Sequence, residues 1–186
     1  MSGKVLDSKA LEVLTLKADK FLIAHDHENL KTFLESISDT EYSFERLIDE
    51  AHFYYMLGNC SQELFDNRRL DWFSDELSKA VIYFRKALYT FQKIKSPTGE
   101  EQFLQSCIET NLGNNLSHQG RAFCCIPLWD AAYKRKKNPV AIISKARHAL
   151  FLAESVYDPS HMHYHYFIAY QLINLGLECL EQLHPE

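Results

Sequence analysis

The sequence is poor in residues that interrupt regular secondary structure, with only 6 glycines and 5 prolines among 186 residues. All-β domains need frequent turns rich in these residues, so their scarcity argues against a β-sandwich or barrel. The chain has no run of 18 apolar residues and no charged-then-apolar start, so we expect neither a membrane span nor a signal peptide. The 5 cysteines form no CxxC pair, which predicts free thiols and a cytoplasmic location.

Positive charge is also lacking overall, since the formal net charge is −5 at pH 7. This balance gives no global attraction to nucleic acid or to an anionic membrane. Residues 121–157 depart from it, because Asp130 and Glu154 are their only acidic residues. The basic band in this segment comprises Lys134, Arg135, Lys136, Lys137, Lys145 and Arg147, with Arg121 nearby. The band is compatible with RNA or an acidic partner, but cations at a helix end are also favoured by the helix dipole alone.

What the sequence does contain is a series of helix start signals. They are Ser38 with Glu41, Thr98 with Glu101, Asn138-Pro139 and Asp158-Pro159. The first two have the spacing of a capping box, and the last two place a side-chain acceptor before a proline at the first helical position. With the apolar periodicity, they predict helices near 8–24, 27–36, 40–60, 74–95, 99–118, 121–137, 139–157 and 159–183. The span 61–73 is the least periodic and is a candidate insertion.

Three segments repeat one spacing, in which a small residue precedes a large one by four positions and another small residue follows three positions later. They are Ala80, Phe84 and Ala87; Cys125, Trp129 and Ala132; and Ala169, Ile173 and Gly176. Offsets of four and three stay on one helix face, so a neighbouring helix can approach over the small residues while the large one fills the gap.

A Leu-Gly-Asn motif precedes each of the first two segments, at Leu57-Gly58-Asn59 and at Leu112-Gly113-Asn114. A glycine within a helix costs roughly 1 kcal/mol relative to alanine, so Gly58 and Gly113 predict tight helix–helix contacts. Ala149 would take the equivalent small position in the third unit.

This order of motifs resembles the signature of the tetratricopeptide repeat (TPR) family over roughly residues 50–183. The middle unit carries it best, through Leu112-Gly113, Cys125, Trp129, Ala132 and Pro139. The resemblance implies an all-α fold, a TPR-like stack of antiparallel helical hairpins (an α-solenoid). Residues 1–38 would form an N-terminal helical cap, and 39–186 about three degenerate hairpins in a single compact unit with it. A generic helical hairpin bundle is the alternative.

In TPR arrays the first helix of each hairpin lines a concave groove, and the resemblance carries this role over to a polar stripe. The stripe comprises His52, Tyr55, Asn59, Thr110, Asn111, Asn114, His118 and Arg121. Asparagine is a poor helix former, so its amides must have a role. They can pair with the backbone of a bound peptide, or they can bond to the neighbouring helix and hold the stack together. The sequence leaves both roles open.

A narrower resemblance begins at Asn111-Leu-Gly-Asn-Asn-Leu and Gly120-Arg121, continues through Trp129-Asp130 and Pro139, and ends at Tyr157-Asp158. This pattern is similar to the TPR region that precedes HEPN domains in some bacterial proteins, which are implicated in RNA cleavage and antiviral or toxin roles. It implies a sensor module, with catalysis on another domain or chain. The HEPN ribonuclease pattern of Arg and His is matched only by Arg46 and His52, a loose pattern that arises often by chance.

Three clustered histidines, His161, His163 and His165, are the weak candidates for a metal site. On a helix His161 and His165 share a face, whereas His163 points away, and a transition-metal site needs a third or fourth ligand. We therefore expect no bound metal and no cofactor. The adjacent Cys124 and Cys125 point in different directions, and Cys125 is expected in the core.

The sequence thus predicts a protein- or peptide-binding TPR-like scaffold or sensor module rather than an enzyme. The alternative is the regulatory part of an RNA-cleaving HEPN-type defence or toxin system. A protein or peptide is the expected partner. RNA contact through the basic band and homo-oligomer formation are compatible with the sequence, and no membrane contact is expected.

Overall fold

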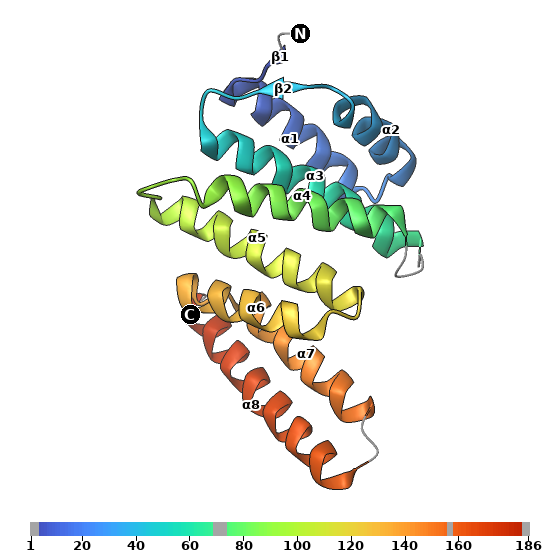
Figure 1. Cartoon of the computed structure of the whole chain (residues 1–186), viewed down its shortest axis with the longest axis vertical. Helices are drawn as coiled ribbons and strands as arrows, with labels where there is room; N and C mark the ends of the chain where they lie inside the picture. The colour runs from blue at the N-terminus through green and yellow to red at the C-terminus, as the bar shows by residue number, and fades with distance from the viewer. Residues whose placement is uncertain (1–3, 69–73, 156–157, 184–186) are drawn as a thin grey trace. The chain divides into compact units, whose positions relative to one another are not determined.

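The computed structural model describes residues 4–68, 74–155 and 158–183, and over these residues the chain is built almost entirely of helices (Figure 1). In chain order the elements are β1 (Lys4–Val5), α1 (Ser8–Ile23), α2 (His27–Ser38), β2 (Tyr42–Ser43), α3 (Leu47–Arg68), α4 (Asp75–Phe91), α5 (Gly99–His118), α6 (Ala122–Lys136), α7 (Pro139–Ser155) and α8 (Pro159–Leu183). The two short strands pair in parallel, Lys4 with Tyr42 and Val5 with Ser43. The predicted all-α class is confirmed.

Three of the predicted helix starts are confirmed by hydrogen bonds at the helix ends. At α5 the Thr98 amide donates to Oε2 of Glu101 at 2.7 Å, and the Glu101 amide donates to Oγ1 of Thr98 at 3.3 Å. This reciprocal pair is a complete capping box. Oδ1 of Asn138 accepts from the second residue of α7 at 3.0 Å, and Oδ1 of Asp158 accepts from the second residue of α8 at 2.8 Å.

The fourth predicted start, a capping box of Ser38 with Glu41, is wrong. Ser38 is the last residue of α2, and its hydroxyl donates to the Glu35 carbonyl at 3.5 Å. The chain then extends into β2, so α3 begins at Leu47 and not at residue 40. Residues 61–68 continue α3 as regular helix despite their weak periodicity. The rest of the suspected insertion, 69–73, lies outside the described residues.

The chain forms two compact units, residues 1–101 and 102–186. In the first unit, α2 packs against α1 and α3, α1 packs against α3, and α3 packs against α4. One apolar core joins the first three of these helices: Leu6, Leu11, Ala18, Leu30, Phe33, Leu34, Ile37, Phe53, Met56, Leu57, Cys60 and Leu64. Residues 8–38 share this core with α3, and the boundary between the two compact units falls near residue 101.

Two glycines mark places where helices approach closely, as their sequence context predicts. A Cβ atom added at Gly58 would lie 2.6 Å from the Phe84 ring, and one added at Gly113 would lie 2.6 Å from Nε1 of Trp129. Phe84 is 0% exposed and Trp129 is 1% exposed, so each ring fills the space that a missing side chain leaves. The small residues beside these rings, Ala80, Ala87, Cys125 and Ala132, are all buried. The packing predicted for the first two segments is confirmed.

The third segment packs differently from the other two. Ala169 is buried, but Ile173 is 40% exposed and does not fill a gap between helices. The prediction that Ile173 takes the large position is therefore wrong. Instead Gly176 of α8 faces α7, where an added Cβ atom would lie 3.2 Å from Cγ1 of Ile143.

The cysteines are free thiols, as their spacing predicts. Burial raises the pKa of Cys60 to about 12 and that of Cys125 to about 11, so both thiols stay protonated near neutral pH. Cys125 is 0% exposed and confirms the expected core position, whereas Cys124 is exposed. None of the described helices is both long and apolar enough to cross a bilayer.

Candidate functional site

A pocket of about 280 Å³ lies between α1 and α3 in the first unit. Its lining residues are Thr15, Asp19 and Leu22 from α1, and His52, Tyr55, Met56 and Asn59 from α3. On α1 these positions are three or four residues apart, and on α3 His52 and Asn59 each lie three or four residues from both Tyr55 and Met56, so the side chains on each helix share the face that meets the other helix. The structure therefore brings together His52, Tyr55 and Asn59, the three residues predicted for ligand binding in this unit, on one pocket.

The pocket combines apolar and polar surface. Met56 is 3% exposed and, with Leu22, supplies the apolar part. Oγ1 of Thr15 is buried and has no hydrogen-bond partner among the described residues. A buried hydroxyl in this state typically costs about 1–3 kcal/mol, which a hydrogen-bonding ligand would offset. Thr15 was missed by sequence reasoning because nothing in α1 indicates that it faces α3.

His52 enters the pocket as a neutral group near pH 7. Burial lowers its pKa, and the carboxylates of Asp49 and Asp19 oppose this shift only in part. One ring nitrogen of a neutral imidazole donates a hydrogen bond and the other accepts one. Asp19 is then the single ionised side chain lining the pocket, which gives the pocket an acidic character.

Arg46 is the residue that a ribonuclease pattern would pair with His52, but it is engaged elsewhere. Its Nε atom lies 3.6 Å from Oδ2 of Asp49. The same carboxylate oxygen accepts a hydrogen bond from the Ser8 hydroxyl at 2.7 Å. Asp49 is 8% exposed, so it offsets the Arg46 charge at close range. Arg46 therefore has a carboxylate beside it, while its side chain stays 60% exposed.

In the second unit, two of the residues predicted for ligand binding take part in helix packing. The indole Nε1 of Trp129 donates to Oδ1 of Asn114 at 3.0 Å. Thr110 is 1% exposed, and its hydroxyl donates to the Ser106 carbonyl at 2.8 Å. The same hydroxyl oxygen accepts from Nδ2 of Asn138 at 3.4 Å, which ties α5 to the turn before α7. Of the two roles that the sequence leaves open, Asn114 and Thr110 have the inter-helix one.

The other predicted residues of this unit lie apart from any pocket described above. The Asn111 carbonyl accepts from Nδ2 of Asn115 at 2.7 Å within α5. His118 is exposed at the last position of α5, and Arg121 is exposed just before α6. Asn111, Asn114 and His118 are three and four residues apart along α5, so they share one side of that helix, and their predicted role in ligand binding stays a prediction.

The basic band is partly neutralised by carboxylates of its own unit. Nη2 of Arg135 lies 2.9 Å from Oε1 of Glu109, and Nζ of Lys145 lies 2.6 Å from Oδ1 of Asp130. The ammonium group of Lys137 lies 4.7 Å from the centre of the Tyr133 ring. Lys134 and Arg147 are exposed, and Lys136 is half-buried. The basic band therefore attracts RNA less strongly than its sequence suggests.

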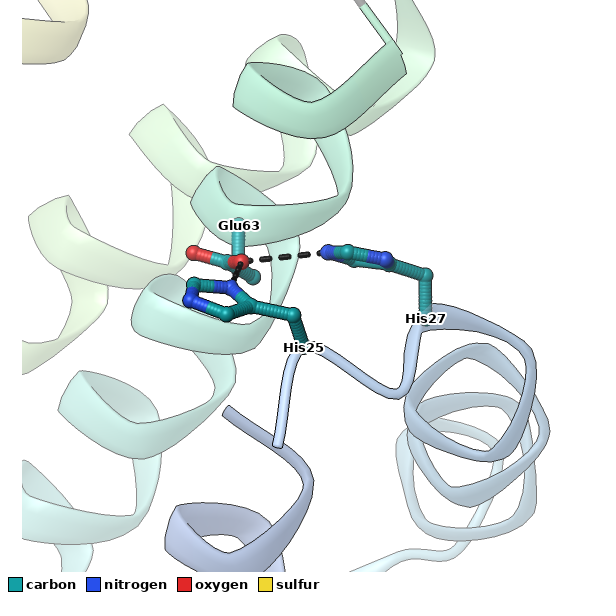
Figure 2. Close-up of side chains that lie close together, drawn as sticks. All are labelled: His25, His27 and Glu63. Atoms are coloured by element: carbon teal, nitrogen blue, oxygen red, sulfur yellow. Dashed lines mark hydrogen bonds and ion pairs between the residues drawn. The ribbon is translucent and has the colours of Figure 1, made fainter. Parts of the chain in front are cut away.

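The clustered histidines of α8 do not form a metal site with other described residues. His161 and His163 are exposed and His165 is half-buried, and no third ligand of suitable type gathers with them in the part of the chain that the structure describes. A different group of residues does gather: His25, His27 and Glu63. Figure 2 shows both imidazole rings, carried by the turn between α1 and α2 and by the start of α2, directed at the Glu63 carboxylate on α3.

In this His–Glu–His cluster both imidazole rings direct a nitrogen at the same carboxylate oxygen. Nδ1 of His25 lies 2.9 Å from Oε1 of Glu63, and Nε2 of His27 lies 3.1 Å from the same oxygen. All three ligand atoms lie within 4.8 Å of one another. Burial acts to raise the pKa of Glu63, but hydrogen bonds from His25 and His27 outweigh it, and the net shift of that pKa is downward. The sequence signal was the spacing His25-x-His27, which went unnoticed because the third residue lies on another helix.

An exposed apolar stripe runs along α8 in the second unit. Its members are Tyr166, Tyr170, Ile173, Leu177 and Leu180, which are 42%, 61%, 40%, 52% and 37% exposed. The spacing of four and three residues keeps them on one helix face. The buried Cys179 lies on the opposite side of the helix, whereas the buried Ala169 borders the stripe. Helix α8 is therefore apolar on more than the face that packs against α7.

No family model matches the chain, and searches of the curated proteins and of the solved structures return no match. The TPR and HEPN resemblances therefore stay predictions.

Proposed function

We propose that the chain is a TPR-like scaffold that binds an extended peptide segment of a protein partner in the pocket between α1 and α3. The observation that carries the proposal is the convergence of His52, Tyr55 and Asn59 with Thr15 and Asp19 on one pocket. A peptide-binding face needs hydrogen-bonding side chains along neighbouring helices, beside apolar surface that excludes water. This pocket provides both.

The helix contacts of the first unit support the TPR-like part of the proposal. The hairpins α1/α2 and α3/α4 follow each other in sequence, and their first helices, α1 and α3, pack side by side. Helix α2 packs against both of them. In a TPR array the first helices of successive hairpins line the concave face, and a pocket between α1 and α3 would belong to such a face if the array forms. By this view the first 38 residues are a hairpin of the array.

The chemistry of the pocket favours a peptide with a basic side chain. Asp19 is the ionised group in the lining, and His52 is neutral, so a lysine or arginine would gain an ion pair there. The unpartnered hydroxyl of Thr15 can accept from a peptide N–H or donate to a peptide carbonyl. The side-chain amide of Asn59 has a donor and an acceptor, so it can bond to a peptide N–H and to a peptide carbonyl at once.

A peptide library displayed on phage tests the proposal. We expect selection of segments with a lysine or arginine, and Asp19→Asn should weaken their binding by about tenfold, the loss of one charge-assisted hydrogen bond. Asp39→Asn is the matched control, because Asp39 is exposed at the end of α2 and does not line the pocket. Backbone amide NMR shifts on peptide addition should concentrate on α1 and α3. Shifts confined to other helices, or equal affinity in the Asp19 variant, would contradict the proposal.

We do not extend the proposal to the regulatory part of an RNA-cleaving system. That alternative relies on the basic band, and two of its cations, Arg135 and Lys145, already lie against carboxylates. RNA binding that falls steeply with added salt and is lost on replacing Lys134 and Arg147 would support the RNA-related alternative.

A further inference from the structure

The His–Glu–His cluster of His25, His27 and Glu63 has the ligand set and the convergence of a metal site. Two imidazole nitrogens from one turn point at a single carboxylate oxygen from another helix. A simple pair of ion pairs would be satisfied by one nitrogen on each of the two carboxylate oxygens. The shared oxygen instead places all three ligand atoms around one small volume.

The distances are close to those that a metal ion requires. Zinc lies about 2.0–2.2 Å from imidazole nitrogen and carboxylate oxygen, so two ligands of a tetrahedral site are about 3.4 Å apart. The observed separations between the nitrogens and Oε1 are 2.9 and 3.1 Å. Side-chain rotations that move these atoms apart by a few tenths of an ångström would open the site. The ion would take the place of the protons in the two hydrogen bonds that the histidines form with Glu63.

The backbone holds the two histidines in place before any ion arrives. His25 has a φ of 50°, a left-handed conformation that non-glycine residues adopt at some cost. Its amide donates to the Leu22 carbonyl at 3.2 Å, and the Asp26 amide donates to the Phe21 carbonyl at 3.0 Å. Asp26 also caps α2 by accepting from Asn29. Asp26 is therefore occupied by the cap, while its two neighbours are free to direct their rings at Glu63.

We propose that Nδ1 of His25, Nε2 of His27 and Oε1 of Glu63 bind a divalent transition-metal ion, Zn²⁺ foremost. Two nitrogens and one carboxylate oxygen suit this class, whereas Ca²⁺ and Mg²⁺ prefer sites made of oxygen. The His25 side chain is 74% exposed, so water can reach the ion as a further ligand. The ion would clasp the turn between α1 and α2 to α3. This inference is independent of the proposed peptide function.

The test is calorimetric titration of Zn²⁺ into the full chain without an affinity tag, with Cys124→Ser as the background because Cys124 is an exposed thiol. We expect one ion per chain and a rise in melting temperature, since the ion binds the folded form. His25→Gln and Glu63→Gln should each lower the affinity at least about tenfold. His25→Gln should disturb the fold less than Glu63→Gln, because most of the His25 side chain is exposed. Circular dichroism should show that each variant keeps its helices.

The matched control uses the other histidine cluster. His161→Gln combined with His165→Gln should leave the Zn²⁺ affinity unchanged. Co²⁺ in place of Zn²⁺ should give a visible absorption band that the Glu63 variant loses. The absence of saturable binding, or equal affinity in the Glu63→Gln or His25→Gln variant, would overturn the proposal. So would a loss of binding in the His161 and His165 double variant alone.

Discussion

The indole N–H of Trp129 on α6 donates a hydrogen bond to the side-chain oxygen of Asn114 on α5 at 3.0 Å. Trp129 is 1% exposed, so this polar contact lies inside the second unit. Asn114→Ala should therefore lower the free energy of unfolding by about 1–3 kcal/mol, because it leaves a buried N–H without an acceptor. This loss should exceed the gain from the better helix propensity of alanine, which is below about 1 kcal/mol. Urea unfolding of both proteins measures the difference.

A double-mutant cycle identifies the contact responsible. Trp129→Phe removes the donor, so Asn114→Ala should cost much less in that background than in the natural chain. Equal losses in both backgrounds would show that Asn114 acts through another group.

The close approach at Gly58 and Gly113 predicts that both glycines resist replacement. Alanine would add a Cβ atom 2.6 Å from the Phe84 or Trp129 ring, and both rings are buried. Gly58→Ala and Gly113→Ala should each destabilise by about 1–3 kcal/mol, the usual range for overpacking. Gly176→Ala is the control, because its Cβ would lie 3.2 Å from Cγ1 of Ile143, a contact that a small shift relieves. Thermal melts should show a lower melting temperature only for the first two variants.

Acid should weaken the fold through His148. This residue is 8% exposed, its Nε2 has no hydrogen-bond partner among the described residues, and its ring lies 5.7 Å from that of Trp129. Burial lowers its pKa, and the nearby His165 lowers it further. The unfolded chain therefore takes up a proton below about pH 6.5 while the folded chain resists it, so stability falls as pH falls.

The variant His148→Phe keeps an aromatic ring without a proton to gain. Its unfolding free energy should depend less on pH between about 5 and 7 than that of the natural chain, where one proton gives a slope of at most about 1.4 kcal/mol per pH unit. An unaltered slope in His148→Phe would contradict the assignment.

The ion pair of Arg135 with Glu109 should matter more than that of Lys145 with Asp130. The Glu109 side chain is 5% exposed and the Arg135 side chain 31%, whereas the values for Lys145 and Asp130 are 27% and 40%. Arg135→Met leaves a buried carboxylate without its cation and should cost about 1–3 kcal/mol, less than a fully buried pair because of the partial exposure. Lys145→Met should cost at most about 1 kcal/mol. Denaturant unfolding at two salt concentrations measures how much unfolding free energy each variant loses. Equal losses in Arg135→Met and Lys145→Met would contradict this ranking.

Three helix starts could be predicted from the sequence because helix caps depend on neighbours along the chain, and the close contacts at Gly58 and Gly113 left a local signal in it. Thr98 and Glu101 satisfy each other's amides three residues apart, whatever packs around them. Gly58 and Gly113 lie inside helices, where glycine is unfavourable, so their presence indicated a packing constraint. The same local reasoning failed at Ser38, because residues 42–43 pair with β1, a segment far away in the sequence.

Only the tertiary structure decided which side chains share a site. Thr15 and Asp19 join His52 because α1 packs against α3, and no residue of α1 signals this contact. Glu63 meets His25 across 38 positions and His27 across 36. Asn114 could have served a ligand or a neighbouring helix, and the choice depended on where the Trp129 ring lies. Which helices meet, and through which faces, follows from burial of the whole core rather than from local preference, so these convergences cannot be derived from spacing along the chain.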